Sequence, residues 1–144
     1  MRYVVLLAIL LALILASCGG PPPDTTVPDP PKSVPLERSD NDKINKLLEG
    51  WEREVPAAMK AAGVKDPIEE KLFRSTATLQ EIDEFYRSQL TQKGWHQAPN
   101  MPGIHDGVLL TGYEIDTTTL VIAAVDATQL GSSGVIVYTV KGTK

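Results

Sequence analysis

Two histidines and an aspartate are the residues of this chain best suited to hold a metal ion. His96, His105 and Asp106 lie in one stretch, and imidazole nitrogens and carboxylate oxygens are common zinc ligands. A catalytic zinc needs three protein ligands and one open position, and a gap of nine positions between the histidines fixes no such geometry. We therefore predict no metal site, and a metal-dependent hydrolase that uses this loop is the least favoured function.

Paired carboxylates and a serine pair are the other residues that can act as acids, bases or nucleophiles. General acid and base work needs one carboxyl group desolvated and its neighbour solvated. Lysine and arginine residues are interspersed with the paired carboxylates of this chain, which instead indicates a charge-mixed surface. Ser132-Ser133-Gly134 lacks the G-x-S-x-G context of an activated serine and is typical of a turn. We expect no enzyme and no cofactor. The carboxylate pairs considered are Glu69 with Glu70, Glu81 with Glu84, and Glu114 with Asp116.

The single cysteine, Cys18, follows an unbroken apolar run over residues 3–16. Arg2 precedes this run, and the small residues Ala16 and Ser17 stand directly before the cysteine, which is the layout of a signal peptide. A membrane-spanning helix needs about 20 apolar residues, so the run is too short for one. Ordinary secretion would leave a lone thiol at the new N-terminus, and lipidation accounts for that thiol.

Leu15-Ala16-Ser17-Cys18 resembles the lipobox of bacterial lipoproteins. The resemblance implies that residues 1–17 are removed and that Cys18 carries acyl groups such as palmitate. The protein would then be anchored through this lipid to the cell membrane or to an outer membrane, with its domain on the extracytoplasmic side. Plain secretion and an uncleaved anchor are the alternatives.

The mature chain is mildly acidic. It keeps 13 of the 14 Lys and Arg residues against 18 Asp and Glu residues, a formal net charge of −5. Nucleic acids and anionic headgroups attract clustered cations, so neither is an expected partner. A lone cysteine also forms no disulfide within the chain, so the stability of the fold must come from packing.

Residues 19–36 have the composition of a linker, because seven of the 18 are proline. Proline fixes φ and lacks the backbone donor, so this stretch is expected to form neither a helix nor a sheet ladder. An extended spacer of this length reaches up to roughly 55 Å. We expect residues 18–37 to be the lipidated cysteine and its linker, and residues 38–144 to be a single domain that folds alone.

Two helices are expected within that domain. Ser39 and Asp42 have capping-box spacing, and an apolar stripe continues to a break at Pro56 and a stop at Gly63. Thr78 and Glu81 form a second capping box, and the helix that they open ends at Gly94.

Strands are expected at 70–75, 108–116, 120–127 and 135–141, the last three joined by short loops. Helices followed by hairpin-connected strands indicate an α+β fold. We expect an antiparallel sheet of about four to five strands with both helices packed on one face.

The run from Ser75 to Tyr86, continued by Leu90 and Gly94-Trp95, is similar to a pattern in small uncharacterised domains of bacterial exported proteins. In those domains a strand ends in Ser or Thr, a helix carries an aromatic pair, and Gly-Trp begins the following sheet. The resemblance implies an α+β fold and no particular activity.

The favoured function is a non-enzymatic interaction module of the cell envelope that holds a protein or polymer through a sheet face or edge. The alternative is a small-ligand carrier with an apolar pocket between helices and sheet. That pocket would be lined by Trp51, Tyr86, Trp95 and Tyr113.

Overall fold

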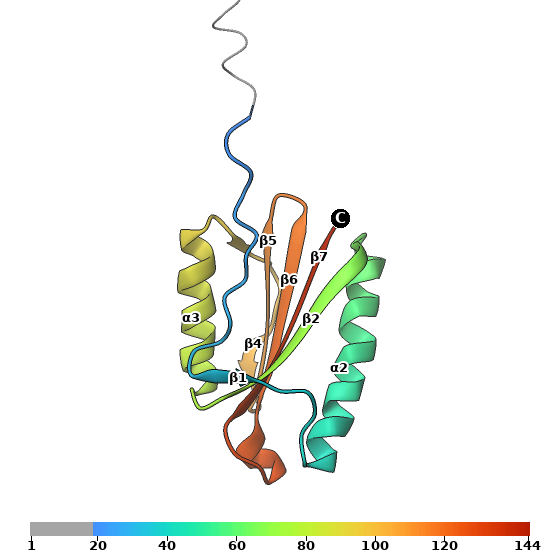
Figure 1. The fold of residues 1–144 in the computed structure, drawn as a ribbon, viewed down its shortest axis with the longest axis vertical. Helices are drawn as coiled ribbons and strands as arrows, with labels where there is room; N and C mark the ends of the chain where they lie inside the picture. Colours follow the sequence, from blue (N-terminus) through green and yellow to red (C-terminus); the bar gives the residue numbers. More distant parts are fainter. Residues whose placement is uncertain (1–18) are drawn as a thin grey trace, which may run out of the picture.

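A computed structural model describes residues 19–144, so the predicted signal peptide and Cys18 lie outside the described residues. The strands form one antiparallel sheet of seven in the order β1-β2-β7-β6-β5-β3, with β4 also paired to β5 (Figure 1). The elements in chain order are β1 (Ser33–Pro35), α2 (Asp42–Ala61), β2 (Lys65–Ser75), α3 (Leu79–Gln92), β3 (His96–Gln97), β4 (Gly103–His105), β5 (Val108–Ile115), β6 (Thr118–Asp126), a 3₁₀ turn η1 (Ala127–Leu130) and β7 (Val135–Thr143).

The α+β class is confirmed, but the sheet has more strands than the expected four to five. The additional strands β1, β3 and β4 are only two or three residues long, too short to show a period-2 pattern in the sequence. Of the longer strands, β2 begins at Lys65 rather than residue 70. Its first half is charged and contains Pro67, which obscures the strand signal.

The first helix differs from expectation both at its N-cap and at Pro56. Asn41 is the N-cap, and its side chain accepts hydrogen bonds from the backbone N–H groups of Lys43 and Ile44; Ser39 and Asp42 form no capping box. α2 also runs through Pro56 to Ala61. Met59 is buried against the sheet beyond the proline, and this packing holds the last turns in place.

The second helix begins as predicted. Thr78 Oγ1 accepts from the N–H of Glu81, and the Glu81 carboxylate accepts from the N–H of Thr78 at 2.7 Å. Gly94 follows the helix with φ of 89°, a conformation that favours glycine after a helix C-terminus.

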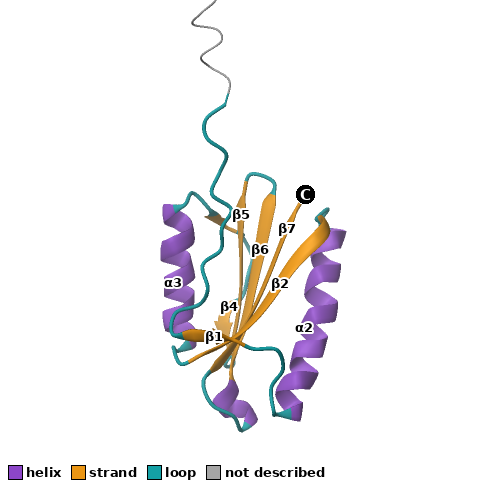
Figure 2. Cartoon of the chain, in the orientation of Figure 1, coloured by secondary structure: helices purple, strands orange, loops and turns teal. Residues whose placement is uncertain are grey.

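The two helices lie on opposite faces of the sheet, so the prediction that both pack on one face is wrong (Figure 2). On β7, Val135 and Val137 pack with α3, whereas Ile136, Tyr138 and Val140 face α2. The reason lies in the central strands: residues 120–125 of β6 and 135–138 of β7 are apolar without alternation, and a sheet with two apolar faces must be covered on both.

The proline-rich segment belongs to the folded structure from Asp24 onward, and the prediction that it forms no sheet ladder is wrong. Ser33–Pro35 pairs with the end of β2 as β1, and Val27 packs against the core on the α3 side. Figure 1 shows the chain running down beside α3 before it reaches β1. Prolines are tolerated here because β1 is an edge strand that needs few backbone donors.

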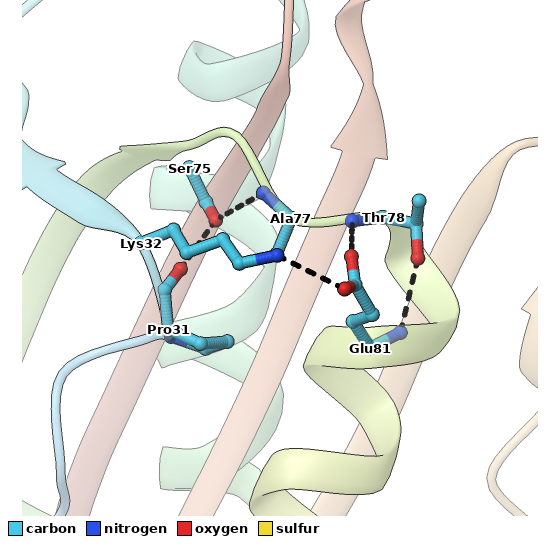
Figure 3. Close-up of polar contacts among 6 residues, drawn as sticks. All are labelled: Pro31, Lys32, Ser75, Ala77, Thr78 and Glu81. Carbon is cyan, nitrogen blue, oxygen red and sulfur yellow. Dashed lines mark hydrogen bonds and ion pairs between the residues drawn. The ribbon is translucent and has the colours of Figure 1, made fainter.

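Hydrogen bonds and an ion pair hold this segment at its C-terminal end. The Oγ of Ser75 donates to the carbonyl of Pro31 at 2.6 Å, and the N–H of Thr76 donates to the carbonyl of Lys32 at 3.1 Å. Lys32 Nζ also reaches the carboxylate of Glu81 at 3.1 Å (Figure 3).

Candidate functional site

The structure does not bring together the three candidate metal ligands His96, His105 and Asp106. His105 and Asp106 are neighbours at the β4–β5 turn, with Nε2 and Oδ2 3.0 Å apart and both side chains at least 80% exposed. His96 instead pairs with Glu114 near the far end of β5, while His105 pairs with Val108. Six residues of strand separate the two positions by about 20 Å. Among residues 19–144 no group of three potential metal ligands occurs.

One carboxylate of each pair, Glu69, Glu81 or Glu114, is engaged with a cation or with a backbone group. Glu69 bonds Lys141 and Lys71, at 3.0 and 3.2 Å, and these bonds, from Lys141 first, lower the pKa of its carboxyl. Glu81 has a lowered pKa because it accepts from the backbone of Thr78 and then from Lys32. Glu114 pairs with Lys144 at 2.7 Å. The lowered pKa values favour the ionised forms of Glu69 and Glu81, whereas a general acid would need the opposite shift.

The serine pair lies in the irregular turn before β7, as predicted. Ser132 Oγ accepts from Arg74 at 3.3 Å, and the carbonyl of Ser133 accepts from the same guanidinium at 2.6 Å. Arginine at this distance supplies no base, so the arrangement offers the hydroxyls no activation.

Of the four aromatic residues expected to line a pocket, only Trp51 does so. Tyr86, Trp95 and Tyr113 are fully buried in the core between α3 and the sheet, on the face opposite Trp51. The single-pocket arrangement is therefore wrong, because the two helices do not share a face.

An apolar groove lies on the other face, between α2 and strands β5 and β6, and we call it the α2 groove. Its volume is about 510 Å³, within the range of roughly 300–1,000 Å³ typical of small-molecule sites. The helix supplies one wall and the strands supply the floor. The apolar side chains that line it include Trp51, Val55, Ala58, Met59, Met101, Leu110 and Val121.

The groove exists because α2 covers only part of its face of the sheet. Trp51 stacks on Tyr138 of β7, with ring centroids 6.4 Å apart and planes 15° apart. Met59 and Val64 pack on the same side with Tyr138 and Val140, so the helix lies toward β7. The parts of β5 and β6 that carry Leu110 and Val121 are left as an apolar floor beside the helix.

The chain between β3 and β4 supplies the second wall. The N–H of Ala98 donates to the carbonyl of Gly112 at 2.8 Å, which holds this loop against β5. Gly112 has no side chain, and a Cβ built there would lie 3.4 Å from the Cβ of Ala98 and 3.5 Å from Met101 Cε. These are ordinary van der Waals distances, so the loop lies in contact with the strand at Gly112 and forms this side of the groove.

Polar side chains are confined to the groove's rim. Glu54 lies on the helix side, and Glu114, Thr119 and Lys144 line the end near the β5–β6 turn. Lys144 Nζ donates to Glu114 Oε1, so two of the rim charges neutralise each other. The arrangement can hold an apolar group inside while a polar group stays in water.

The other surfaces of the described chain are less suited to binding. A second hollow of about 430 Å³ at the N-terminus of α3 is lined by polar and apolar residues in equal number. Two of its polar side chains are already engaged, because Thr78 accepts from the N–H of Glu81 and Asp126 accepts from the N–H of Thr128. The outer edge of β2 beyond β1 is open, but it carries Pro67 and a row of charges over 65–71. Charges and proline on an edge strand disfavour pairing with another strand.

Reasoning from the sequence missed the groove's strand and loop residues. Ala98 and Met101 lie in a proline-rich loop with no periodicity, and Leu110 and Val121 belong to strands for which one covered face was assumed. The available signal was the run Leu120 to Val125, because an apolar strand without alternation indicates that both faces are apolar.

Comparison of the chain with protein-family models, with curated proteins and with solved structures finds no match. Within residues 19–144, none of the helices has the length and apolar character needed to cross a membrane.

Proposed function

We propose that this chain is a lipid-anchored protein of the cell envelope whose domain is a non-enzymatic binding module. The anchor is the acylated Cys18 that follows the apolar leader. The α2 groove is the binding surface, and it is the single observation that carries the proposal.

The geometry favours binding through this groove over binding through a sheet edge. The charged outer edge of β2 opposes strand addition, and Val34 and Ile104 are the only large apolar side chains counted as exposed in the described chain. The α2 groove instead presents apolar side chains of α2 over the apolar floor of β5 and β6. A small-ligand carrier is the second candidate function, favoured by the groove's volume of about 510 Å³.

The anchor is tested by replacing Cys18 with Ala in the full chain. A single acyl chain gives only marginal membrane binding, whereas two or three chains on one cysteine give a stable attachment. We expect the native chain to incorporate labelled palmitate and to partition into detergent. The Cys18→Ala chain should do neither; its retention in the detergent phase after removal of the leader would refute lipid anchoring.

The groove is tested by photo-crosslinking in intact cells. A photoreactive amino acid at Ala58, which lines the groove, should capture the bound partner or ligand. Ala57 is a matched control, because it is also exposed on the same helix but points about 100° away. If the products at the two positions are the same, or if Ala58 gives none, the groove is not the binding surface.

A further inference from the structure

The α2 groove and the start of the folded chain lie at the same end of the sheet. Asp24 is held at the C-terminal end of α3, because its carboxylate bonds Lys93 at 3.1 Å and its carbonyl accepts from Trp95 Nε1 at 3.2 Å. A Cβ built at Gly94, directly before Trp95, would lie 3.7 Å from Cδ1 of Ile115. Ile115 pairs with Thr118 as the last pair of the β5–β6 hairpin, so the attachment point of Asp24 lies at the hairpin's end of the sheet. Glu114 and Thr119, on the groove's rim, are the adjacent pair.

The chain between that point and the proposed anchor is short. Only six peptide steps separate Asp24 from Cys18, and a fully extended chain spans about 3.3–3.6 Å for each, so the tether reaches about 20 Å. Pro21, Pro22 and Pro23 make it semi-rigid. A free linker over residues 19–36 would reach roughly 55 Å. The shorter tether therefore keeps the rim of the groove close to the lipid headgroups.

The chemistry inside the groove suits a hydrocarbon chain. Its inner lining is aliphatic, aromatic and thioether side chains, and Met59 and Met101 are flexible enough to adapt to a variable shape. A peptide main chain would find few hydrogen-bond partners in the groove, because the backbone groups of β5 and β6 on the floor already pair with each other. Burying peptide groups without hydrogen-bond partners is costly, whereas an acyl chain has none to satisfy.

We infer that the α2 groove binds one acyl chain of a bilayer lipid, with the headgroup left in water at the rim formed by Glu114, Thr119 and Lys144. The inference rests on the proposed function, because it is the lipid at Cys18 that brings the groove to the membrane. The bilayer is the source of the chain, and the anchor's own acyl groups remain in the membrane.

The two tryptophans provide the test, since Trp51 lines the groove and Trp95 is buried in the core on the opposite face. The full chain, purified from membranes in detergent, is reconstituted into phosphatidylcholine vesicles that contain a phospholipid spin-labelled near the end of one acyl chain. We expect the label to quench most of the Trp51 emission. Trp51→Phe, which leaves only Trp95, should be quenched little.

Two further variants separate occupation of the groove from contact with the membrane surface. Ala58→Phe fills the groove and should abolish the quenching, whereas Ala57→Phe on the same helix should retain it. A label on the headgroup should quench Trp51 less than the label near the chain end.

Several results would overturn the inference. They are the absence of Trp51 quenching, equal quenching in Trp51→Phe, and stronger quenching by the headgroup label. If Trp51 is unquenched while Ala58 still crosslinks a protein in cells, the acyl inference fails and the groove remains the binding surface. If the chain does not enter the vesicles at all, the lipid anchor fails and the inference falls with it.

Discussion

The hydroxyl of Ser75 donates a hydrogen bond to the carbonyl of Pro31 at 2.6 Å across 44 positions of sequence. Ser75 is fully buried, and its oxygen also accepts from the N–H of Ala77 at 3.0 Å. One side chain thereby fixes both the turn between β2 and α3 and the end of the proline-rich segment. The segment's attachment to the domain depends on a residue at the end of β2.

Replacing Ser75 with Ala should lower the free energy of unfolding by about 1–3 kcal/mol, because the N–H of Ala77 and the carbonyl of Pro31 both lose their partner. Denaturant unfolding measures this change. Ser88→Ala is the control, since Ser88 is exposed on α3, and its effect should stay within about 0.5 kcal/mol. Equal effects of the two substitutions would show that the Ser75 bonds do not support the fold.

A chain that begins at Arg38 should be less stable than one that begins at Gly19. It lacks β1, the packing of Val27 and the contacts of Asp24 with Lys93 and Trp95. Several hydrogen bonds of about 0.5–1.5 kcal/mol each are lost, so a decrease above about 2 kcal/mol is expected in denaturant melts. If the two chains have the same denaturant midpoint and the same slope of unfolding free energy, residues 19–37 do not stabilise the domain and act as a passive linker.

Acid should release the proline-rich segment before it unfolds the domain. Hydrogen bonds from Thr26, and then from Lys93, lower the pKa of Asp24 to about 2. A lowered folded pKa means that the contribution of Asp24 is present above its ordinary value near 4 and is lost as pH falls toward 2. The backbone amide of Thr26 should therefore exchange faster at pH 2 than at pH 5, after correction for intrinsic rates. Asp24→Asn should remove this pH dependence. If the exchange rate of Thr26 depends on pH in the same way in the variant, a group other than Asp24 causes the dependence.

Local sequence signals predicted the parts of the fold that local interactions determine. Thr78 and Glu81 begin α3, and Gly94 ends it, because each acts within a few residues of itself. The segment around Pro31 was misread because its partner, Ser75, is distant in sequence and composition says nothing of that contact. The placement of the helices was misread because a helix stripe shows that a face is buried but not which sheet face covers it.

The candidate site was even less accessible to sequence reasoning. Trp51 was the one groove residue predicted to line a pocket, since a tryptophan on a helical stripe is a visible apolar feature. The groove depends on where α2 stops covering β5 and β6, and on the loop of Ala98 and Met101 lying against β5. Both are consequences of tertiary packing that no single segment encodes.

The last prediction compares two buried tyrosine hydroxyls. The hydroxyl of Tyr86 has no hydrogen-bond partner among the described residues, and burial raises its pKa. Tyr138 instead donates to Glu70 Oε2 at 2.6 Å. Removing an unsatisfied buried group relieves its desolvation, so Tyr86→Phe should raise the free energy of unfolding by about 1 kcal/mol, whereas Tyr138→Phe should lower it by about 1–2 kcal/mol.

Both substitutions keep the ring and its packing, so packing changes do not mask the difference. Thermal and denaturant melts of the two variants, compared with the native chain, measure the opposite signs. If Tyr86→Phe were as destabilising as Tyr138→Phe, the hydroxyl of Tyr86 would have a bound partner, such as an ordered water, and the core beneath α3 would be polar at that point.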